Sequence, residues 1–319
     1  VIFDSESVFE DNVITVLKQH GWKDGVLRYP TEQDLLDNWK GILYRNNNDI
    51  DRLGKYPLTD GEMAQIIEQI ETLRTPLALN SFVNGRTVSI TRDNKEDVAH
   101  FGKEISLYIY DRKEIAGGKS TYQIAQQPVY PAKNKMLNSR RGDLVLLING
   151  MPLIHIELKK SGIPVSQATN QIEKYTHEGV FTGLFRLVQI FVAMNPDDAV
   201  YFANPGVDKF NPSYYFHWAD YNNEPICGGQ NPGKDEWKLF IGGTSGTAGL
   251  LSIPMAHQLI GFYTIADSAD GCLKVLRSYQ YIAANAISDV VRKCDWEQRP
   301  TTPGRPGGYV WHTTGSGKT

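Results

Sequence analysis

Apolar residues recur at helical spacing in two stretches of the N-terminal region. The segment Ser7–Glu10 reads as a capping box, because a serine is followed three residues later by a glutamate at the start of an apolar run. It predicts a helix that ends near His20-Gly21. A second helix is predicted from Gly61 to about Leu79. The apolar positions that support these helices are Phe9, Val13, Val16 and Leu17 in the first and Met63, Ile66, Ile67, Ile70 and Leu73 in the second.

Extended segments follow, and the two longest apolar ones flank Asn149-Gly150, a dipeptide that favours a tight hairpin turn. These strands, Asp143–Ile148 and Pro152–Lys159, are largely apolar on both faces, so we expect them inside the sheet. A helix at Val165–Glu178 and a strand at Leu187–Met194 complete the pattern of an α/β core. Earlier strands are expected at Thr87–Thr91, Ile105–Asp111 and Tyr122–Tyr130.

The composition changes between Asn195 and Gly249, where proline, glycine and asparagine cluster. Such a stretch is typical of a domain boundary, which we place near residue 230. Residues 1–230 are therefore expected to form one domain, and residues 231–319 a linker and the start of a second. Within the second part, a helix is predicted at Lys274–Val291.

The overall composition restricts the class of protein. The 319 residues are 41% hydrophobic and 22% charged, which is ordinary for a soluble globular chain. The longest apolar stretches, such as Ile190–Met194, are too short to span a membrane, and residues 1–10 carry no basic region like that of a secretory signal. Cys227, Cys272 and Cys294 form no CxxC pair, which argues against a zinc site or a disulfide framework. We expect a cytoplasmic protein without a membrane partner.

Charged residues mark the two ends of the predicted hairpin. Asp143 begins the first strand, while Glu157 and Lys159 close the second and, being two residues apart, share one face. Two carboxylates and a lysine suit metal-assisted cleavage of a phosphodiester bond. Asp143 and Glu157 would hold Mg²⁺ through hard oxygen ligands. Lys159 would orient the attacking water or offset charge on the phosphorus.

The spacing D-x13-E-x-K is weak by itself, since these charges could be ordinary strand ends. A buried strand that ends in Glu157, Lys159 and a further Lys160 argues otherwise, because unpaired buried charges are costly. Geometry adds a condition. In a simple two-residue hairpin Asp143 would face Ile156, so the connection must be odd in length or the ladder must carry a β-bulge.

The block RGDLVLLINGMPLIHIELKK, residues 141–160, resembles the signature block of type I restriction-enzyme R subunits. The resemblance implies a PD-(D/E)xK nuclease core, that is, a mixed sheet flanked by helices, followed by the beginning of a RecA-like helicase domain. It also implies that Asp143, Glu157 and Lys159 form the nuclease active site. The likeness covers residues 100–180 most specifically.

Two further features of that family have counterparts here. It carries a Q-x-x-x-Y element on the next helix, which Gln171 and Tyr175 match one helical turn apart. The resemblance implies that they support the active site or touch the DNA backbone, while the alternative is a pair that packs the helix on the sheet. The family also has an acidic residue on its first helix near the metal site. Glu10 is that candidate, unless it only caps the helix.

Basic residues gather just before the predicted catalytic strand. Lys133, Lys135, Arg140 and Arg141 lie within nine residues, with no acid before Asp143. The formal net charge of −3 excludes a strongly basic body but allows such a local stripe. These residues are candidates for phosphate contacts, and a solvated loop is the alternative.

A short apolar strand, Tyr309–Trp311, leads into the sequence HTTGSGKT, residues 312–319, which reads as a P-loop. Backbone amides there would cradle phosphates of ATP, with Lys318 on the β- and γ-phosphates and Thr319 on Mg²⁺. The stretch resembles superfamily 2 helicases, and Arg277-Ser278-Tyr279-Gln280 resembles their Q motif, in which Gln280 would read the adenine edge. The residues assigned to ATP are Gln280, Gly315, Ser316, Gly317, Lys318 and Thr319. Because the chain stops within this motif, we expect the natural polypeptide to continue.

The resemblance implies a type I site-specific deoxyribonuclease that needs Mg²⁺ and ATP. Cutting of double-stranded DNA would follow ATP-driven translocation by the full-length chain, in a complex with methyltransferase and specificity subunits. One alternative is a type III-like or stand-alone nuclease–helicase without these partners. Another is a non-cutting DNA-binding or docking module of the same fold, which would have no use for an intact set of Asp143, Glu157 and Lys159.

Overall fold

The computed structural model describes residues 2–115, 117–131, 140–207, 209–229, 235–269, 271–293 and 309–311. The predicted P-loop, including Gly315 to Thr319, lies outside the described residues, as do Lys133 and Lys135. None of the helices within these ranges is long and apolar enough to span a membrane.

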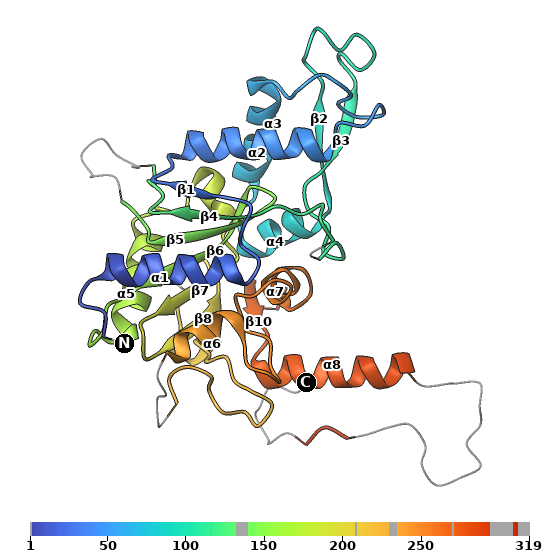
Figure 1. The fold of residues 1–319 in the computed structure, drawn as a ribbon. Helices are drawn as coiled ribbons and strands as arrows, with labels where there is room; N and C mark the ends of the chain where they lie inside the picture. The colour runs from blue at the N-terminus through green and yellow to red at the C-terminus, as the bar shows by residue number, and fades with distance from the viewer. Residues whose placement is uncertain are drawn as a thin grey trace, which may run out of the picture.

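A six-stranded mixed sheet forms the centre of the molecule (Figure 1). The strand order is β1-β4-β5-β6-β7-β8, with parallel pairs β1/β4 and β6/β7 and antiparallel pairs elsewhere. The strands β4 to β8 are buried along their whole length, as expected for the middle of a covered sheet. The bounds are β1 Val26–Arg28, β4 Tyr122–Gln126, β5 Leu144–Ile148, β6 Met151–Leu158, β7 Ile190–Met194 and β8 Ala199–Ala203.

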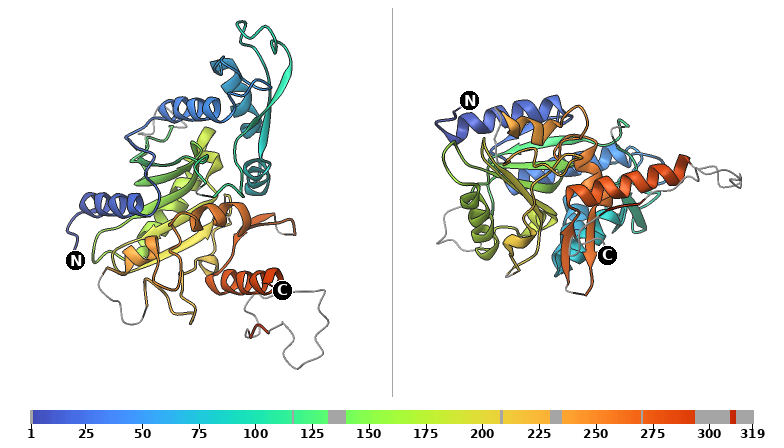
Figure 2. Two further views of the ribbon diagram at one scale, coloured as in Figure 1. Left: turned by 45° about the vertical axis from the view of Figure 1, so that its right-hand side comes forward. Right: turned by 90° about the horizontal axis from the view of Figure 1, so that it is seen from below.

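Helices cover both faces of this sheet. Alternate residues of β7 show this, since Phe191 packs in a cluster with α5 (Val165–His177), whereas Val192 packs in the large cluster that includes α1 (Glu6–Gln19). The two helices lie on opposite sides of the sheet in Figure 2. The other helices are α2 Glu32–Asn46, α3 Asp60–Thr72, α4 Pro76–Asn84, α6 Glu236–Gly242, α7 Met255–Phe262 and α8 Ser278–Lys293, with 3-10 turns at Gly183–Leu187 and Pro212–Tyr214.

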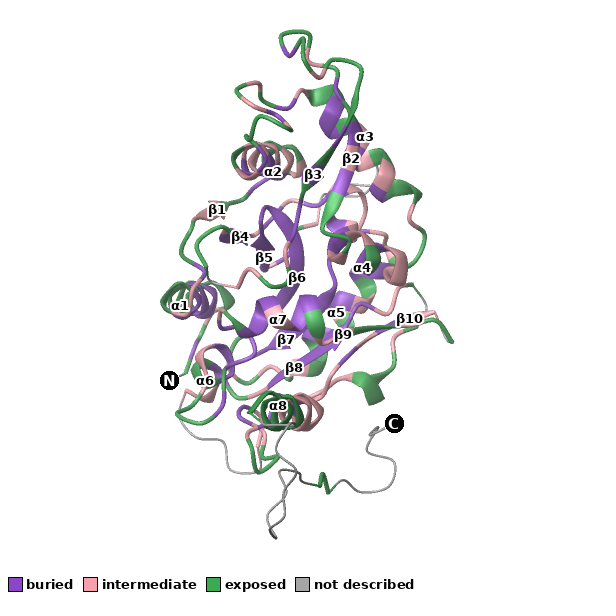
Figure 3. Cartoon of the chain, turned by 90° about the vertical axis from the view of Figure 1, so that its right-hand side faces the viewer, coloured by how far each residue is buried: buried purple, intermediate pink, exposed green. Residues whose placement is uncertain are grey.

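Two small hairpins flank the main sheet. One pairs β2 (Thr87–Thr91) with β3 (Glu104–Tyr108), and the other pairs β9 (Thr264–Asp267) with β10 (Cys272–Val275). The colours of Figure 3 show the contrast between the buried central strands and the largely exposed α8. The predicted architecture, a mixed sheet flanked by helices, is therefore confirmed.

The first predicted helix is confirmed, but its cap is a different residue. Ser5, not Ser7, is the N-cap, and its side chain accepts a hydrogen bond from the Val8 amide. Glu10 therefore lies inside the helix, with its side chain buried, and has no part in a capping box.

The prediction of one continuous helix at residues 61–79 is wrong, because the structure has two helices there, α3 and α4. The first ends at Thr72, and Thr75 caps the second with Pro76 in its first turn. A proline is suited to the first turn of a helix and not to its interior, which explains the break.

The hydrophobic core continues past the predicted boundary at residue 231. Trp237 of α6 packs edge-on against Phe3 and Phe9, with ring centroids 5.9 and 5.2 Å apart. The indole nitrogen of Trp22 donates a 2.6 Å hydrogen bond to the Leu251 carbonyl. A motor domain that begins at residue 231 thus stays a prediction, and it has to accommodate a shared core up to Val275.

We expect Trp237→Ala to lower the free energy of unfolding by about 3–5 kcal/mol, the usual cost of removing a buried tryptophan. Because the core is shared, the N-terminal sheet should melt at lower urea concentration together with α6. Urea denaturation followed by far-ultraviolet circular dichroism measures this. An unchanged main transition would contradict the shared core and favour an independent unit after residue 231.

Candidate active site

A β-bulge brings Asp143 and Glu157 together. The hairpin is a two-residue turn, with Asn149 at φ 53° and Gly150 at φ 84°, as such turns require. The register then shifts by one: Leu147 pairs with Pro152, but Leu146 pairs with Ile154, which leaves Leu153 as the extra residue. Leu144 consequently faces Ile156, so Asp143 faces Glu157. This confirms the bulge, one of the two geometries that the sequence allowed.

The pair is tied to the end of β6. A carboxylate oxygen of Asp143 accepts a 2.6 Å hydrogen bond from the Leu158 amide. Lys159 places its Nζ 3.7 Å from Glu157 Oε1 and 3.5 Å from Glu6 Oε1, and donates to the Leu158 carbonyl at 2.9 Å. The structure therefore brings together the three residues predicted to be catalytic, while their roles stay a prediction.

The two carboxyl groups have strongly altered acidity. Burial raises the pKa of Asp143 well above its ordinary value, and the nearby Glu157 carboxylate raises it further. Burial likewise raises the pKa of Glu157 to about 8, an effect that the Lys159 ammonium partly opposes. Without a cation the pair therefore keeps a proton at pH 7.

Glu157 has the character of a metal ligand. Both of its carboxylate oxygens are buried, and neither has a hydrogen-bond partner among the described residues. Such orphaned acceptors are rare in folded proteins unless a water or an ion satisfies them. Within the same part of the chain, no three His, Cys, Asp or Glu side chains are grouped to hold a metal. Two carboxylates still fit Mg²⁺, which keeps several water ligands.

Glu10 of α1 lies beside this pair. Its carboxylate accepts hydrogen bonds from the side-chain nitrogens of Gln126, at 2.6 Å, and Gln127, at 3.2 Å. Its charge contributes to the raised pKa of Asp143, and burial raises the pKa of Glu10 itself. Sequence reasoning missed both glutamines. The only signal was two consecutive amides in the middle of a predicted strand, Tyr122–Tyr130.

Gln171 and Tyr175 are brought together on α5 and hold the backbone ahead of Asp143. The Gln171 side chain donates a 2.6 Å hydrogen bond to the Tyr175 hydroxyl, which donates in turn to the Arg141 carbonyl at 3.0 Å. Tyr175 is buried, and burial followed by the Glu157 charge raises its pKa to about 12. The pair thus supports the segment that positions Asp143.

The two arginines predicted to contact phosphates differ in their surroundings. Arg140 forms a bidentate ion pair with Glu178 at the end of α5, at 2.9 and 3.0 Å. Arg141 is exposed, and its guanidinium lies 5.8 Å from the centre of the Tyr29 ring. Arg141 is therefore the more available of the two for a contact with a phosphate. Contact of either arginine with DNA stays a prediction.

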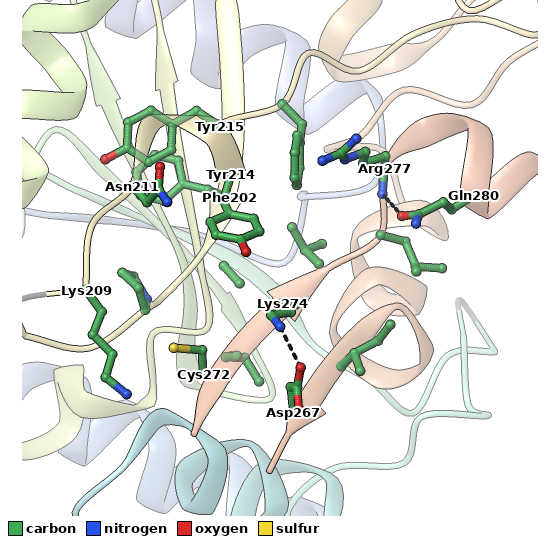
Figure 4. A pocket seen from close by; sticks show the side chains of 17 residues that line it. Phe202, Lys209, Asn211, Tyr214, Tyr215, Asp267, Cys272, Lys274, Arg277 and Gln280 are labelled. Carbon is green, nitrogen blue, oxygen red and sulfur yellow. Dashed lines mark hydrogen bonds and ion pairs between the residues drawn. The ribbon is translucent and has the colours of Figure 1, made fainter. Parts of the chain in front are cut away.

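Gln280 lies on the first turn of α8, away from the carboxylates. Its side-chain oxygen accepts a 2.9 Å hydrogen bond from the Arg277 amide. Both residues line a cavity of about 370 Å³, which Tyr214 and Lys274 also line (Figure 4). Since the P-loop lies outside the described residues, the predicted joint role of Gln280 and Lys318 in ATP binding is not tested.

Sequence reasoning also missed a buried pair beside Glu157. The Tyr130 hydroxyl and His155 Nδ1 are 2.8 Å apart, and His155 Nε2 lies 3.2 Å from Glu157 Oε2. Burial lowers the pKa of His155 to about 4, so its ring is neutral at pH 7. The signal in the sequence was a histidine two residues before Glu157, hence on the same face of the strand.

We expect Tyr175→Phe to loosen the segment before Asp143, because the Arg141 carbonyl loses its donor. The free energy of unfolding should fall by about 1 kcal/mol, the usual net contribution of one hydrogen bond, here a partly buried one. Amide exchange of residues 140–144, measured by mass spectrometry, should speed up. Tyr263→Phe, which loses a hydroxyl bonded to Asn285, is the control and should leave that segment unchanged. Equal exchange in both variants would refute the positioning role.

Glu157→Gln should stabilise the chain in a pH-dependent way. The folded state holds a proton on Glu157 up to about pH 8, whereas the unfolded chain releases it near 4.5, so stability falls as pH rises between these values. Without divalent cations the variant should therefore exceed wild type by roughly 1–3 kcal/mol at pH 8 and by less at pH 5. Urea denaturation measures this, with the exposed Glu68→Gln as control. A gain that is independent of pH would contradict the raised pKa.

The chain is similar to known proteins along its whole length. Residues 4–210 match the family described as type I restriction enzyme R protein N terminus. The chain is 29% identical, over all of its length, to the type I restriction enzyme SsaAORF53P endonuclease subunit of Staphylococcus saprophyticus. It is 31% identical over 99% of its length to the SauCOLORF180P endonuclease subunit of Staphylococcus aureus.

The chain spans only part of these relatives. It covers 30% of the Staphylococcus saprophyticus protein and 29% of the Staphylococcus aureus protein. A match to the type I restriction enzyme EcoprrI endonuclease subunit of Escherichia coli, 29% identical, covers 66% of the chain and 62% of that relative.

Proposed function

This chain belongs to the family of type I restriction enzyme R proteins, as part of their N-terminal region, and we propose that it carries their DNA-cutting site. The proposed reaction is Mg²⁺-dependent hydrolysis of phosphodiester bonds in double-stranded DNA. The observation that supports it most is the pair of Asp143 and Glu157 facing each other across the hairpin, in which the buried Glu157 has two acceptor oxygens without a partner among the described residues.

Each residue of the site has a proposed role that follows from its chemistry. Asp143 and Glu157 would bind the cation, and the hydrogen bond from the Leu158 amide fixes the first of them. A bound divalent cation would supply polarisation of the phosphate and activation of water. Lys159, held within 4 Å of Glu157, would place a positive charge where negative charge develops on the phosphate.

The neighbouring residues would position this set. Glu10 is held by two glutamines next to Asp143, so its charge would add to the attraction for a cation. Gln171 and Tyr175 hold the Arg141 backbone, and Arg141 itself is exposed at the rim, where a DNA phosphate could approach.

Further roles are proposed for the full-length protein. The P-loop that ends in Lys318-Thr319 would bind ATP with Mg²⁺, with Gln280 at the adenine, and the motor would translocate DNA before cutting. The names of the relatives say that they are endonuclease subunits of type I restriction enzymes. By analogy, methyltransferase and specificity subunits are the proposed partners in the cytoplasm.

Substitution of the active-site residues should separate cutting from ATP hydrolysis in the assembled enzyme. Glu157→Ala and Lys159→Ala should lower cleavage of circular plasmid by at least about 100-fold, the scale for losing one such electrostatic contribution. DNA-stimulated ATPase should stay near normal, because the P-loop is distant in sequence. Lys318→Ala should abolish both activities. Plasmid nicking on agarose gels and phosphate release measure the two.

Lys160→Ala is the matched control for the lysine. It is the exposed neighbour, and its ammonium donates to the Asp4 carbonyl, at 3.3 Å, so cleavage should persist. Normal cleavage by Lys159→Ala would refute its catalytic assignment. Equal loss from Lys159→Ala and Lys160→Ala would indicate a general effect of charge at this edge.

A further inference from the structure

Three polar atoms without hydrogen bonds lie together at Glu157, one of the two proposed metal ligands. They are Nε2 of His155 and the two carboxylate oxygens of Glu157, all buried and without a hydrogen-bond partner among the described residues. The separation between His155 Nε2 and Glu157 Oε2 is 3.2 Å, which is within hydrogen-bonding distance, and rotation of the Glu157 carboxylate would be needed to align the two atoms as a bonded pair.

The other side of the His155 ring is already fixed. Its Nδ1 is 2.8 Å from the Tyr130 hydroxyl, and both side chains are fully buried. A neutral imidazole has one donor and one acceptor nitrogen, so a hydroxyl that donates to Nδ1 leaves the hydrogen on Nε2. Nε2, which then carries the hydrogen, lies 3.2 Å from Glu157 Oε2. When a cation is bound and Glu157 is ionised, the reverse tautomer would place a lone pair against the carboxylate.

Packing prevents the ring from turning away. Aromatic rings of Phe181, Phe191 and Tyr175 surround His155, with centroids 5.4, 6.0 and 6.4 Å away. The glycine before Asp143 is part of the same arrangement: a Cβ at Gly142 would lie 2.5 Å from the Tyr130 hydroxyl and 2.8 Å from His155 Cε1. Any side chain there would collide with the pair.

We propose that Tyr130 and His155 are positioning residues that orient the Glu157 carboxylate for a divalent cation. This inference rests on the proposed function, and neither residue would touch the cation or the DNA. The Tyr130 hydroxyl sets the tautomer of His155, and His155 donates to one oxygen of Glu157. The other oxygen, 3.7 Å from Lys159 Nζ, is left for the cation. Groups that orient metal ligands in this way typically change metal affinity 10- to 100-fold.

The competing account is that the pair only fills the core. In that case Tyr130 and His155 would satisfy each other, and Nε2 would remain a buried donor without an acceptor. The two accounts differ in what substitution does to cation binding. A core role affects folding stability alone, whereas a positioning role affects binding in chains that are equally stable.

Titration calorimetry of the purified chain with Mn²⁺ alone tests the proposal without relying on DNA cleavage. Tyr130→Phe keeps the ring and removes only the hydroxyl, so its Mn²⁺ affinity should fall about 10-fold. His155→Leu should lower affinity at least as much. His155→Gln, whose amide can donate near the position of Nε2, should stay within about threefold of wild type. Melting temperatures of the same samples show whether each variant folds.

Tyr110→Phe is the matched control, because it also removes a buried hydroxyl, one that donates to the His257 carbonyl at 2.9 Å. It should bind Mn²⁺ like wild type. If Glu157→Ala loses binding while Tyr130→Phe and His155→Leu bind like wild type, the inference is overturned and the proposed function stands. A wild-type chain that binds no Mn²⁺, or a Glu157→Ala chain that binds it normally, would overturn both.

Discussion

The close approach of the half-buried Asp143 carboxyl group to the buried Glu157 carboxyl group is the interaction that most of the surrounding structure accommodates. Two carboxyl groups so close together, taken out of water, cannot both ionise without a compensating cation. Burial is the main cause of the raised pKa of each group, and for Asp143 the nearby Glu157 charge raises the pKa further. The fold imposes this contact through a single extra residue, Leu153, since without the bulge the two side chains would lie on opposite faces of the hairpin.

Neighbouring groups hold this unfavourable arrangement in place. The Leu158 amide donates a hydrogen bond to Asp143, and the Lys159 ammonium lies beside Glu157. The Tyr175 hydroxyl donates to the Arg141 carbonyl, two residues before Asp143. Glu10 adds a third acidic group instead of relieving the pair. An arrangement that costs stability and attracts a cation is typical of a functional site, because proteins tolerate such strain where activity requires it. The same reasoning explains why Glu157 keeps acceptors that no described residue satisfies.

Local sequence patterns predicted the features that depend on neighbouring residues. The Asn149-Gly150 turn, the shared face of Glu157 and Lys159, and the need for a bulge or an odd connection all follow from strand geometry. The features that were missed depend on distant segments. The hydrogen bond between Tyr130 and His155 joins residues 25 apart, and no periodicity signals it.

Two other points depend on tertiary structure in the same way. The burial of Glu10 against Gln126 depends on how α1 packs on the sheet, and the local sequence left both a place near the metal site and a role in helix capping open for this residue. The boundary near residue 231 was inferred from composition, but a glycine-rich stretch can also be a surface loop within one core, as the packing of Trp237 shows.

The central claim is that Asp143 and Glu157 share one divalent cation. Crystals of the chain soaked in Mn²⁺ and measured near the manganese absorption edge test it most directly. The account predicts one strong anomalous peak about 2.0–2.3 Å from a carboxylate oxygen of each residue, with water completing the coordination. A peak bound only at Glu10, or an ordered pair of carboxyl groups with no peak between them at saturating Mn²⁺, would contradict it.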